Sequence, residues 1–137
     1  MEKIFVDTNV ILDLLQKREG FYKDAQEIFT MADLRKARIF ISTLSIATAN
    51  YLLSKHYNTT ESRKILSKFK IIVTILPLDN KIIELALASD FKDFEDAIQY
   101  HTALEHELKI IITRNKKDFK KSKISVLTPK EFLSSLK

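Results

Sequence analysis

The chain has 137 residues, of which 45% are hydrophobic and 30% charged, and its formal net charge is +5. This length suits one domain over residues 1–137 that buries roughly two-thirds of its unfolded surface. One glycine and no cysteine exclude glycine-rich phosphate loops, disulfides and thiolate metal sites. No segment approaches the roughly 20 apolar residues of a membrane span, and the first apolar run is too short for a signal peptide. We therefore expect a cytoplasmic protein without a membrane segment.

Short apolar runs alternate with amphipathic segments along the whole chain. The predicted elements are, in chain order, a strand over 3–7, helices from Asn9 and over 25–32, a strand over 38–41, helices over 43–56 and 60–69, a strand over 71–76, helices over 80–89 and 93–108, strands over 110–112 and 124–127, and a closing helix from Pro129. Alternating strands and helices favour an α/β fold, with a five-stranded, mostly parallel sheet and helices on both faces. The ends of the first and fourth strands and the start of helix 93–108 can then converge on one crevice.

The first predicted strand is the most informative segment, because Ile4, Phe5 and Val6 end on the carboxylate of Asp7. Open α/β sheets place their ligands at the carboxyl ends of the strands, and a carboxylate fixed there can hold a divalent metal. A helix follows, and Asn9 suits its N-cap. The alternative is that Asp7 only helps to cap this helix.

A second acidic segment lies at the start of the predicted helix 93–108. Asp93 and Asp96 are three residues apart, so they share one face of its first turn. Acids in a first turn complement the helix dipole, which accounts for Asp93 and Glu95. The helix dipole accounts less well for Asp96, because like charges on one face of a helix repel each other unless a cation lies between them.

The segment after the predicted strand 110–112 combines oxygen ligands with positive charge. Thr113, Asn115 and Asp118 supply a hydroxyl, an amide and a carboxylate. The basic residues between 114 and 123 are Arg114, Lys116, Lys117, Lys120, Lys121 and Lys123. An acidic crevice in a basic surface suits a polyanionic substrate, so this run is a candidate contact for a phosphate backbone. The alternative is a solvated loop.

Residues 7–15, 91–97 and 113–119 together resemble the PIN domain, and among PIN domains the VapC-type ribonuclease toxins of bacterial toxin–antitoxin pairs. The resemblance extends from about residue 3 to residue 133, in the family's order. It implies a three-layer sandwich around a five-stranded parallel sheet, a Mg²⁺ or Mn²⁺ site, and hydrolysis of RNA phosphodiester bonds. It also implies a cognate antitoxin and a homodimer, to which the aromatic Phe21, Tyr22, Tyr51 and Tyr57 are candidate contributors.

The family commonly places four acids in its pocket, and two of them match here. Asp7 matches the acid that ends the first strand, and Asp96 matches the acid of the later helix. The other two positions fall on Thr48 and Asn115, which are neutral. The resemblance therefore implies that Asp7 and Asp96 hold the metal and act in catalysis, with Asp93 as a third ligand or general base. The two neutral positions weaken the case for two tightly held metals more than the case for one.

The remaining implied site residues fall into two groups. The supporting group, which would orient the acids, donate to phosphate or hold water, contains Thr8, Asn9, Thr113, Asn115 and Asp118. The group that would contact the RNA backbone contains Arg114, Lys116, Lys117, Lys120 and Lys121.

Two other functions compete with this interpretation. Haloacid-dehalogenase-like phosphatases also begin with a strand-end Asp, but their second Asp would fall on Asn9, which cannot act as a general acid. A degenerate PIN domain could bind RNA or a protein partner without cleavage, because Thr48 and Asn115 replace two acids. Metal-dependent cleavage of RNA separates this second alternative from a nuclease.

Overall fold

A computed structural model describes residues 1–136. The strands are β1 (Glu2–Val6), β2 (Ala37–Ser42), β3 (Thr74–Leu76), β4 (Ile110–Ile112) and β5 (Ser125–Leu127). The α-helices are α1 (Thr8–Leu15), α2 (Tyr22–Asp33), α3 (Thr43–Leu53), α4 (Thr59–Phe69), α5 (Asn80–Leu87), α6 (Phe94–Glu105) and α7 (Pro129–Ser135). Two short 3-10 helices are η1 (Lys70–Ile72) and η2 (Lys116–Phe119).

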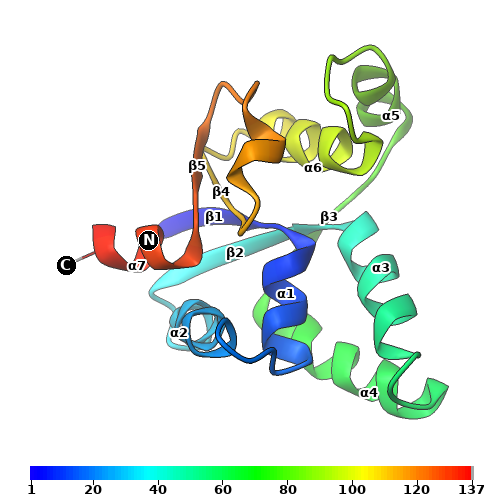
Figure 1. The fold of residues 1–137 in the computed structure, drawn as a ribbon, viewed down its shortest axis with the longest axis vertical. Helices are drawn as coiled ribbons and strands as arrows, with labels where there is room; N and C mark the ends of the chain where they lie inside the picture. Colours follow the sequence, from blue (N-terminus) through cyan, green and yellow to red (C-terminus); the bar gives the residue numbers. More distant parts are fainter. Residues whose placement is uncertain (137) are drawn as a thin grey trace.

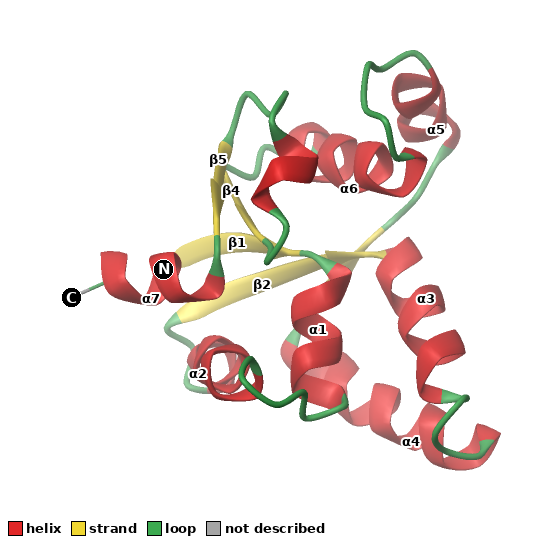
Figure 2. Cartoon of the chain, viewed as in Figure 1, coloured by secondary structure: helices red, strands yellow, loops and turns green. Residues whose placement is uncertain are grey.

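The five strands form one parallel sheet in the order β3-β2-β1-β4-β5, which confirms the predicted fold class (Figure 1). The strand that the chain makes first therefore lies in the middle. Helices α1 to α4 lie on one side of the sheet, and α5 and α6 lie on the other, as Figure 2 shows. The direction of winding reverses beside β1, because β2 and β4 flank it. Ligands of open α/β sheets bind at such a reversal, outside the carboxyl ends of the strands.

Side chains of β1 alternate between the two helical layers. Ile4 and Val6 are fully buried in the core beneath α1 and α2, whereas Phe5 is buried in the core beneath α6. The other central strands alternate in the same way, with Ile111 and Ile112 of β4 in different cores. A strand covered on both faces is apolar at successive positions, and this is why β1 and β4 are evident in the sequence.

One predicted strand is only half correct. The apolar run 71–76 forms strand only from Thr74 onward, because residues 70–72 continue the end of α4 as a 3-10 turn. Ile71 is 81% exposed and belongs to no core. A short apolar run alone does not distinguish a strand from the end of a helix.

Most predicted helices are present, with ends that differ by a few residues. Helix α6 stops at Glu105 and not near residue 108, and Glu107 then adopts the left-handed φ of 59° that turns the chain toward β4. Helix α3 stops at Leu53, earlier than expected. Within residues 1–136, no helix is both long enough and apolar enough to pass through a membrane.

Candidate active site

Two acids that are far apart in the sequence line one small pocket at the carboxyl edge of the sheet. Asp7 follows β1, Asp96 lies in the first turn of α6, and the pocket between them has a volume of about 150 Å³. The other residues that line it are Thr8, Asn9, Leu44, Thr48, Glu95, Gln99 and Asn115. A larger neighbouring pocket of about 310 Å³ shares Asp96 with the first.

Asp7 has the capping role that the sequence left open for it, and it also lines the pocket. It is the N-cap of α1, where its Oδ1 accepts a hydrogen bond from the Thr8 backbone N at 2.8 Å. The prediction that Asn9 caps this helix is wrong, because the chain already enters the helix at Thr8. The Asp7 carboxylate is 7% exposed, and this burial raises its pKa, while hydrogen bonds from Gln99 and Thr113 act in the opposite direction.

Asp96 carries the clearest electrostatic signal in the site. Burial raises its pKa to about 7, and repulsion from the carboxylates of Asp7, Asp93 and Asp118 adds to that effect. The acids of this region thus lie close enough to disfavour one another's charge. A bound cation would relieve this repulsion.

Asp93 has a structural task at the same helix end. Its Oδ1 accepts hydrogen bonds from the backbone N of Glu95 at 2.8 Å and of Asp96 at 3.2 Å, so Asp93 is the N-cap of α6. It lines the larger pocket with Asp96 and Asp118 and is absent from the lining of the smaller one. Asp93 therefore sets the position and the charge environment of Asp96.

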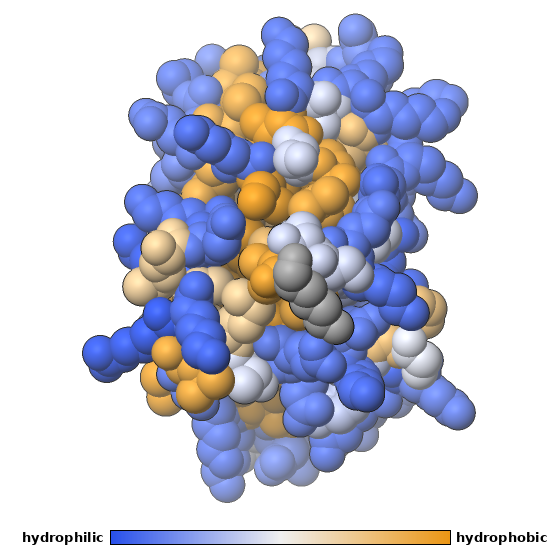
Figure 3. Space-filling model, turned by 90° about the vertical axis from the view of Figure 1, so that its left-hand side faces the viewer, coloured by the Kyte–Doolittle hydropathy of each residue, from blue (hydrophilic) through white to orange (hydrophobic). Residues whose placement is uncertain are grey.

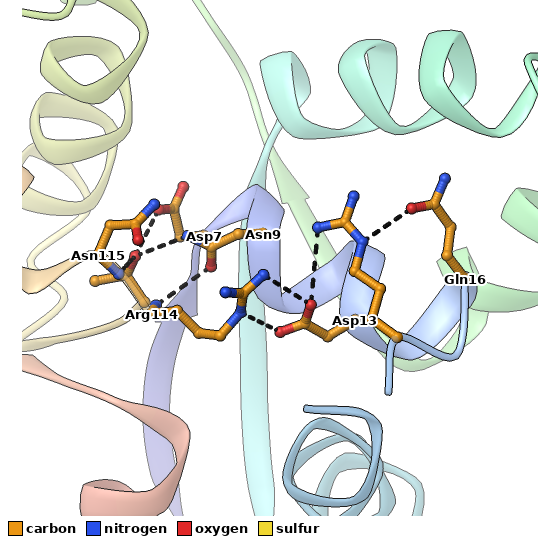
Figure 4. A network of polar contacts seen from close by, with 8 residues as sticks. Asp7, Asn9, Asp13, Gln16, Arg114 and Asn115 are labelled. Atoms are coloured by element: carbon orange, nitrogen blue, oxygen red, sulfur yellow. Dashed lines mark hydrogen bonds and ion pairs between the residues drawn. The ribbon is translucent and has the colours of Figure 1, made fainter. Parts of the chain in front are cut away.

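The segment after β4 supports Asp7 directly, as Figure 4 shows. Thr113 is fully buried, and its Oγ1 donates to Asp7 Oδ2 at 2.8 Å. Of the supporting roles predicted for Thr113, this contact corresponds to orienting an acid, because the hydroxyl proton is engaged by Asp7. Asn9 also lies against this segment: its Nδ2 donates to Thr113 Oγ1, and its Oδ1 accepts from the Arg114 backbone N, both at 3.3 Å. Asn115 is exposed and lines the smaller pocket.

Sequence reasoning missed the buried amide of Gln99. This side chain is 2% exposed, and its Nε2 donates to Asp7 Oδ1 at 3.0 Å and to Ser45 Oγ at 2.8 Å. Its Oε1 accepts a hydrogen bond from Ser42 Oγ. The available signal was its spacing, three residues after Asp96, which places both side chains on one face of α6.

Arg114 does not extend toward the acidic pocket. Its guanidinium forms a two-point ion pair with Asp13, with Nε at 2.6 Å from Oδ2 and Nη2 at 3.1 Å from Oδ1 (Figure 4). It also lies over the Phe21 ring, 3.9 Å from the ring centroid. Asp13 lies in α1 and is 1% exposed, so this buried ion pair connects the end of β4 with α1. The structure thus gives Arg114 a structural role in place of the predicted contact with RNA.

The lysines that follow Arg114 differ in their surroundings. Lys117, Lys120 and Lys121 line the larger pocket beside Asp96. Lys121 lies 3.8 Å from Asp90, whereas Lys116 forms an ion pair with Glu131 of α7 at 3.1 Å, outside this pocket. Among residues 1–136, no ion-pair partner is found for Lys117 or Lys120. These two lysines are therefore the best placed to meet an anion at the site.

The donor set of the smaller pocket fits one hard cation. The carboxylates in its lining are those of Asp7, Asp96 and Glu95, and Asn115 and Thr48 add neutral oxygens. Mg²⁺ often binds proteins through only one or two carboxylates, with water and substrate phosphate completing its shell. No group of three or more His, Asp or Glu placed to hold a metal occurs within residues 1–136.

A parallel α/β sandwich with an acidic, oxygen-lined pocket at its strand ends is the architecture expected for a PIN domain, and comparison with known proteins agrees. The family model described as "PIN domain" matches residues 3–117. Ribonuclease VapC1 of Aquifex aeolicus is 34% identical, over 96% of this chain and 93% of that protein. This chain belongs to the PIN domain family.

Solved structures have the same fold. A toxin–antitoxin complex from Klebsiella pneumoniae contains a chain that is 27% identical, with a TM-score of 0.68 over 92% of this chain and 97% of that one. A DNA-bound VapBC complex from Salmonella typhimurium contains a chain with a TM-score of 0.70, 17% identity, and coverage of 94% and 99%. The resemblance thus extends over nearly the full length of both chains.

Proposed function

We propose that this chain is a divalent-metal-dependent endoribonuclease, which hydrolyses RNA phosphodiester bonds. The observation that supports this most strongly is the pocket in which Asp7 and Asp96 meet beside a lysine-lined hollow, in a PIN-family chain. The 34% identity with a protein named Ribonuclease VapC1, over almost the whole of both chains, supports the same substrate class.

In this proposal Asp7 and Asp96 hold Mg²⁺ or Mn²⁺, and Asn115 and Thr48 face the same ion. When bound, the cation would polarise the phosphate and help to activate the attacking water. Asp93 lines the larger pocket beside Asp96, and its Oδ2, which is not engaged in the helix cap, would act from that side as a third ligand or general base. Asp118 adds negative charge near Asp96, which strengthens the attraction of the site for a cation.

The lysines beside the pocket would hold the negatively charged backbone of the substrate. Lys117, Lys120 and Lys121 line the hollow that shares Asp96, so phosphates bound there would lead directly to the acids. Lysine contacts phosphate as a point charge and does not read base edges. We therefore assign these side chains to binding of the RNA backbone. Lys116 lies outside the hollow, paired with Glu131, and would contribute less.

We further infer that the chain is the toxin of a toxin–antitoxin pair in the cytoplasm, with a cognate antitoxin as its protein partner. This rests on the 27% identity with a chain of a toxin–antitoxin complex, aligned over 92% of this chain and 97% of that one. A neighbouring gene that encodes a small DNA-binding protein would support this assignment.

The test of the proposed activity is RNA cleavage by the purified chain. Single-stranded RNA is incubated with the protein in Mg²⁺ or Mn²⁺, in EDTA, and in EDTA followed by excess metal. We expect internal cleavage with metal, no cleavage in EDTA, and recovery when metal is restored. RNA binding without cleavage under every metal condition would instead favour the degenerate PIN domain, which the neutral Thr48 and Asn115 make the second candidate.

A further inference from the structure

We propose that Gln99 is a positioning residue of this site, whose side-chain amide holds the Asp7 carboxylate in the orientation that a divalent cation requires. The inference rests on the proposed function, since it gives Gln99 a part in the same metal site. It does not make Gln99 a metal ligand. Its amide nitrogen donates to the carboxylate, so the amide acts on the metal only through Asp7.

The orientation of the Gln99 amide is set by Ser42, at the end of β2. Ser42 Oγ accepts a hydrogen bond from the Ser45 backbone N at 3.0 Å. Its single proton has two acceptors in reach, Gln99 Oε1 and Ser45 Oγ at 3.2 Å, and it goes to Gln99 Oε1 because that contact is the shorter one. With the oxygen end of the amide held on Ser42, the NH₂ end must face Asp7. Ser42, Ser45 and Gln99 are all buried, which excludes water as a competing partner.

The NH₂ group has two protons and three nearby acceptors. Asp7 Oδ1 at 3.0 Å and Ser45 Oγ at 2.8 Å are nearer than Thr8 Oγ1 at 3.2 Å. A bond to an ionised carboxylate is stronger than a bond to a hydroxyl, so one proton belongs on Asp7. Gln99 thereby connects α6 with the end of β1 and with α3, three elements that line the pocket.

The Asp7 carboxylate then has a donor from each side. Oδ1 accepts from the Thr8 backbone N and from Gln99, while Oδ2 accepts from Thr113 Oγ1. Without Gln99, the contact from α6 is lost, and the carboxylate can turn about the two contacts that remain. A metal ligand held by outer hydrogen bonds binds its ion more tightly than a ligand that must first be ordered.

Burial of a side-chain amide costs free energy unless its polar atoms are hydrogen-bonded. A primary amide at this position must satisfy its donors and its acceptor, whereas an apolar side chain of the same size needs no partners. Every polar atom of Gln99 has a hydrogen-bond partner, and one of its two N–H groups donates to Asp7. The positioning role accounts for a polar residue where packing alone would favour an apolar one.

The test compares Mn²⁺ binding by the metal-free, full-length wild type and three variants, using titration calorimetry. Gln99→Met keeps the volume of the side chain and removes its donor, and we expect Mn²⁺ affinity to fall about 10-fold or more. Ser42→Ala keeps Gln99 but frees its amide to turn, so a smaller loss is expected. Thr102→Val is the matched control, because Thr102 is a buried polar residue of the same helix whose hydroxyl bonds only to the Ile98 carbonyl. It should bind Mn²⁺ as the wild type does, even if its melting temperature falls.

The outcomes separate this inference from the proposed function. If the wild type binds Mn²⁺ and cuts RNA but Gln99→Met binds Mn²⁺ equally well, the positioning role is wrong and the nuclease assignment stands. If Gln99→Met does not fold, Ser42→Ala decides, and unchanged Mn²⁺ affinity in that variant overturns the inference. A wild type that neither binds Mn²⁺ nor cuts RNA overturns both.

Discussion

At the scale of single residues, Asp7 is a buried charge that serves two purposes, as a helix cap and as a wall of the pocket. Asparagine caps helices about as well as aspartate, so Asp7→Asn should keep α1 while removing the charge that would attract a metal. We expect Asp7→Asn and Asp96→Asn each to lower RNA cleavage by at least about 100-fold, with little change in the free energy of unfolding. Initial rates in Mg²⁺ and urea denaturation measure the two effects.

Asp33→Asn is a suitable control for both substitutions. It makes the same change of charge at an exposed position at the end of α2, outside the pocket. A variant of Asp7 or Asp96 that cut RNA as fast as this control would remove that residue from the proposed chemistry. Loss of folding in both variants would point to a structural role.

The second expectation at this scale concerns the proton on Asp96 in the metal-free protein. Its pKa lies near 7 because of burial and because of repulsion from Asp7, Asp93 and Asp118. Asp7→Asn removes one of these repulsions, so we expect the pKa of Asp96 to fall, as measured by the carboxyl carbon shift in an NMR titration. Asp33→Asn should leave it unchanged, and an equal value in the Asp7 variant would contradict the proposed proximity of the two acids.

The same shift predicts how the stability of the metal-free protein depends on pH. The folded pKa of Asp96 lies above its ordinary value of 3.8, so between 3.8 and about 7 the folded chain binds more protons than the unfolded chain. The contribution of Asp96 to stability is therefore fully present below 3.8 and is lost as pH rises through about 7. Burial raises the pKa of Asp7 as well, so its contribution has the same sign.

At the scale of elements, the Arg114–Asp13 pair joins the end of β4 to α1. Arg114→Met leaves Asp13 charged and 1% exposed without its two-point partner, and removal of one member of a buried pair costs about 3 kcal/mol. We expect that loss in the free energy of unfolding by urea. The control is Arg18→Met, because Arg18 lies 3.8 Å from Asp13 and is 36% exposed, and such a pair is worth about 1 kcal/mol or less. Equal losses in the two variants would contradict the structural role of Arg114.

The lysine-bearing segment around η2 gives a second expectation at this scale. Replacing Lys116, Lys117, Lys120 and Lys121 by Gln should weaken binding of all RNA sequences alike and flatten its dependence on salt. Most of this effect should already be present in a Lys117→Gln, Lys120→Gln double variant, because these two lysines line the larger pocket, whereas Lys116 and Lys121 lie near acidic partners. Binding is measured by fluorescence anisotropy at several salt concentrations.

Lys64→Gln, Lys68→Gln is a control of equal charge, placed on exposed positions of α4. An equal loss in this control would show a general effect of net charge, and no loss in the η2 variants would show an ordinary solvated surface. A loss confined to one RNA sequence would contradict a role limited to the backbone.

Much of the fold could be predicted because the central strands are covered on both faces. Successive apolar residues, as in Ile4 to Val6 of β1 and Ile110–Ile112 of β4, are then required. The same rule misplaced the start of β3, because the exposed Ile71 continues the apolar run without belonging to the sheet. The sequence shows that Ile71 is apolar, but whether an apolar side chain is buried depends on the rest of the fold.

The site could be predicted only in part, for a related reason. Asp7 and Asp96 were evident because each is an acid at the edge of a predicted element. Gln99 was not, because its partners Ser45 and Ser42 lie 54 and 57 residues away and no local pattern records such contacts. The charge of Arg114 favours a contact with RNA when the sequence is considered alone, because its buried partner Asp13 is a lone acid in the apolar run of α1, 101 residues away.

At the scale of the whole molecule, exposed apolar surface supports the predicted homodimer. Tyr51 and Tyr57 are 63% and 40% exposed and Phe21 is 45% exposed, whereas Tyr22 is half-buried. An apolar strip bordered by hydrophilic residues also crosses the side of the molecule on which β5 and α7 lie (Figure 3). Continuous exposed apolar surface such as this strip marks interfaces.

We therefore expect light scattering at micromolar concentration, without an antitoxin, to give twice the chain mass of 15.9 kDa. A Tyr51→Ser, Tyr57→Ser variant should shift the mass toward that of one chain. Leu87→Ser, at a position that is 68% exposed on α5, is the control and should leave it unchanged. A wild type with the mass of a single chain would contradict the homodimer.

The order of the strands has a consequence for the newly made chain. Translation delivers β1, β2 and β3 first, and these neighbours can pair while the rest of the protein is still absent. Asp96, Thr113 and Asn115 arrive only later, since the chain must pass through α5 and α6 before β4 can take its place beside β1. A growing polypeptide at this stage thus has three of the five strands of its sheet but not the completed pocket. If the finished protein cuts RNA, the ribosome that makes it and the message that encodes it are exposed to that activity only at the end of synthesis.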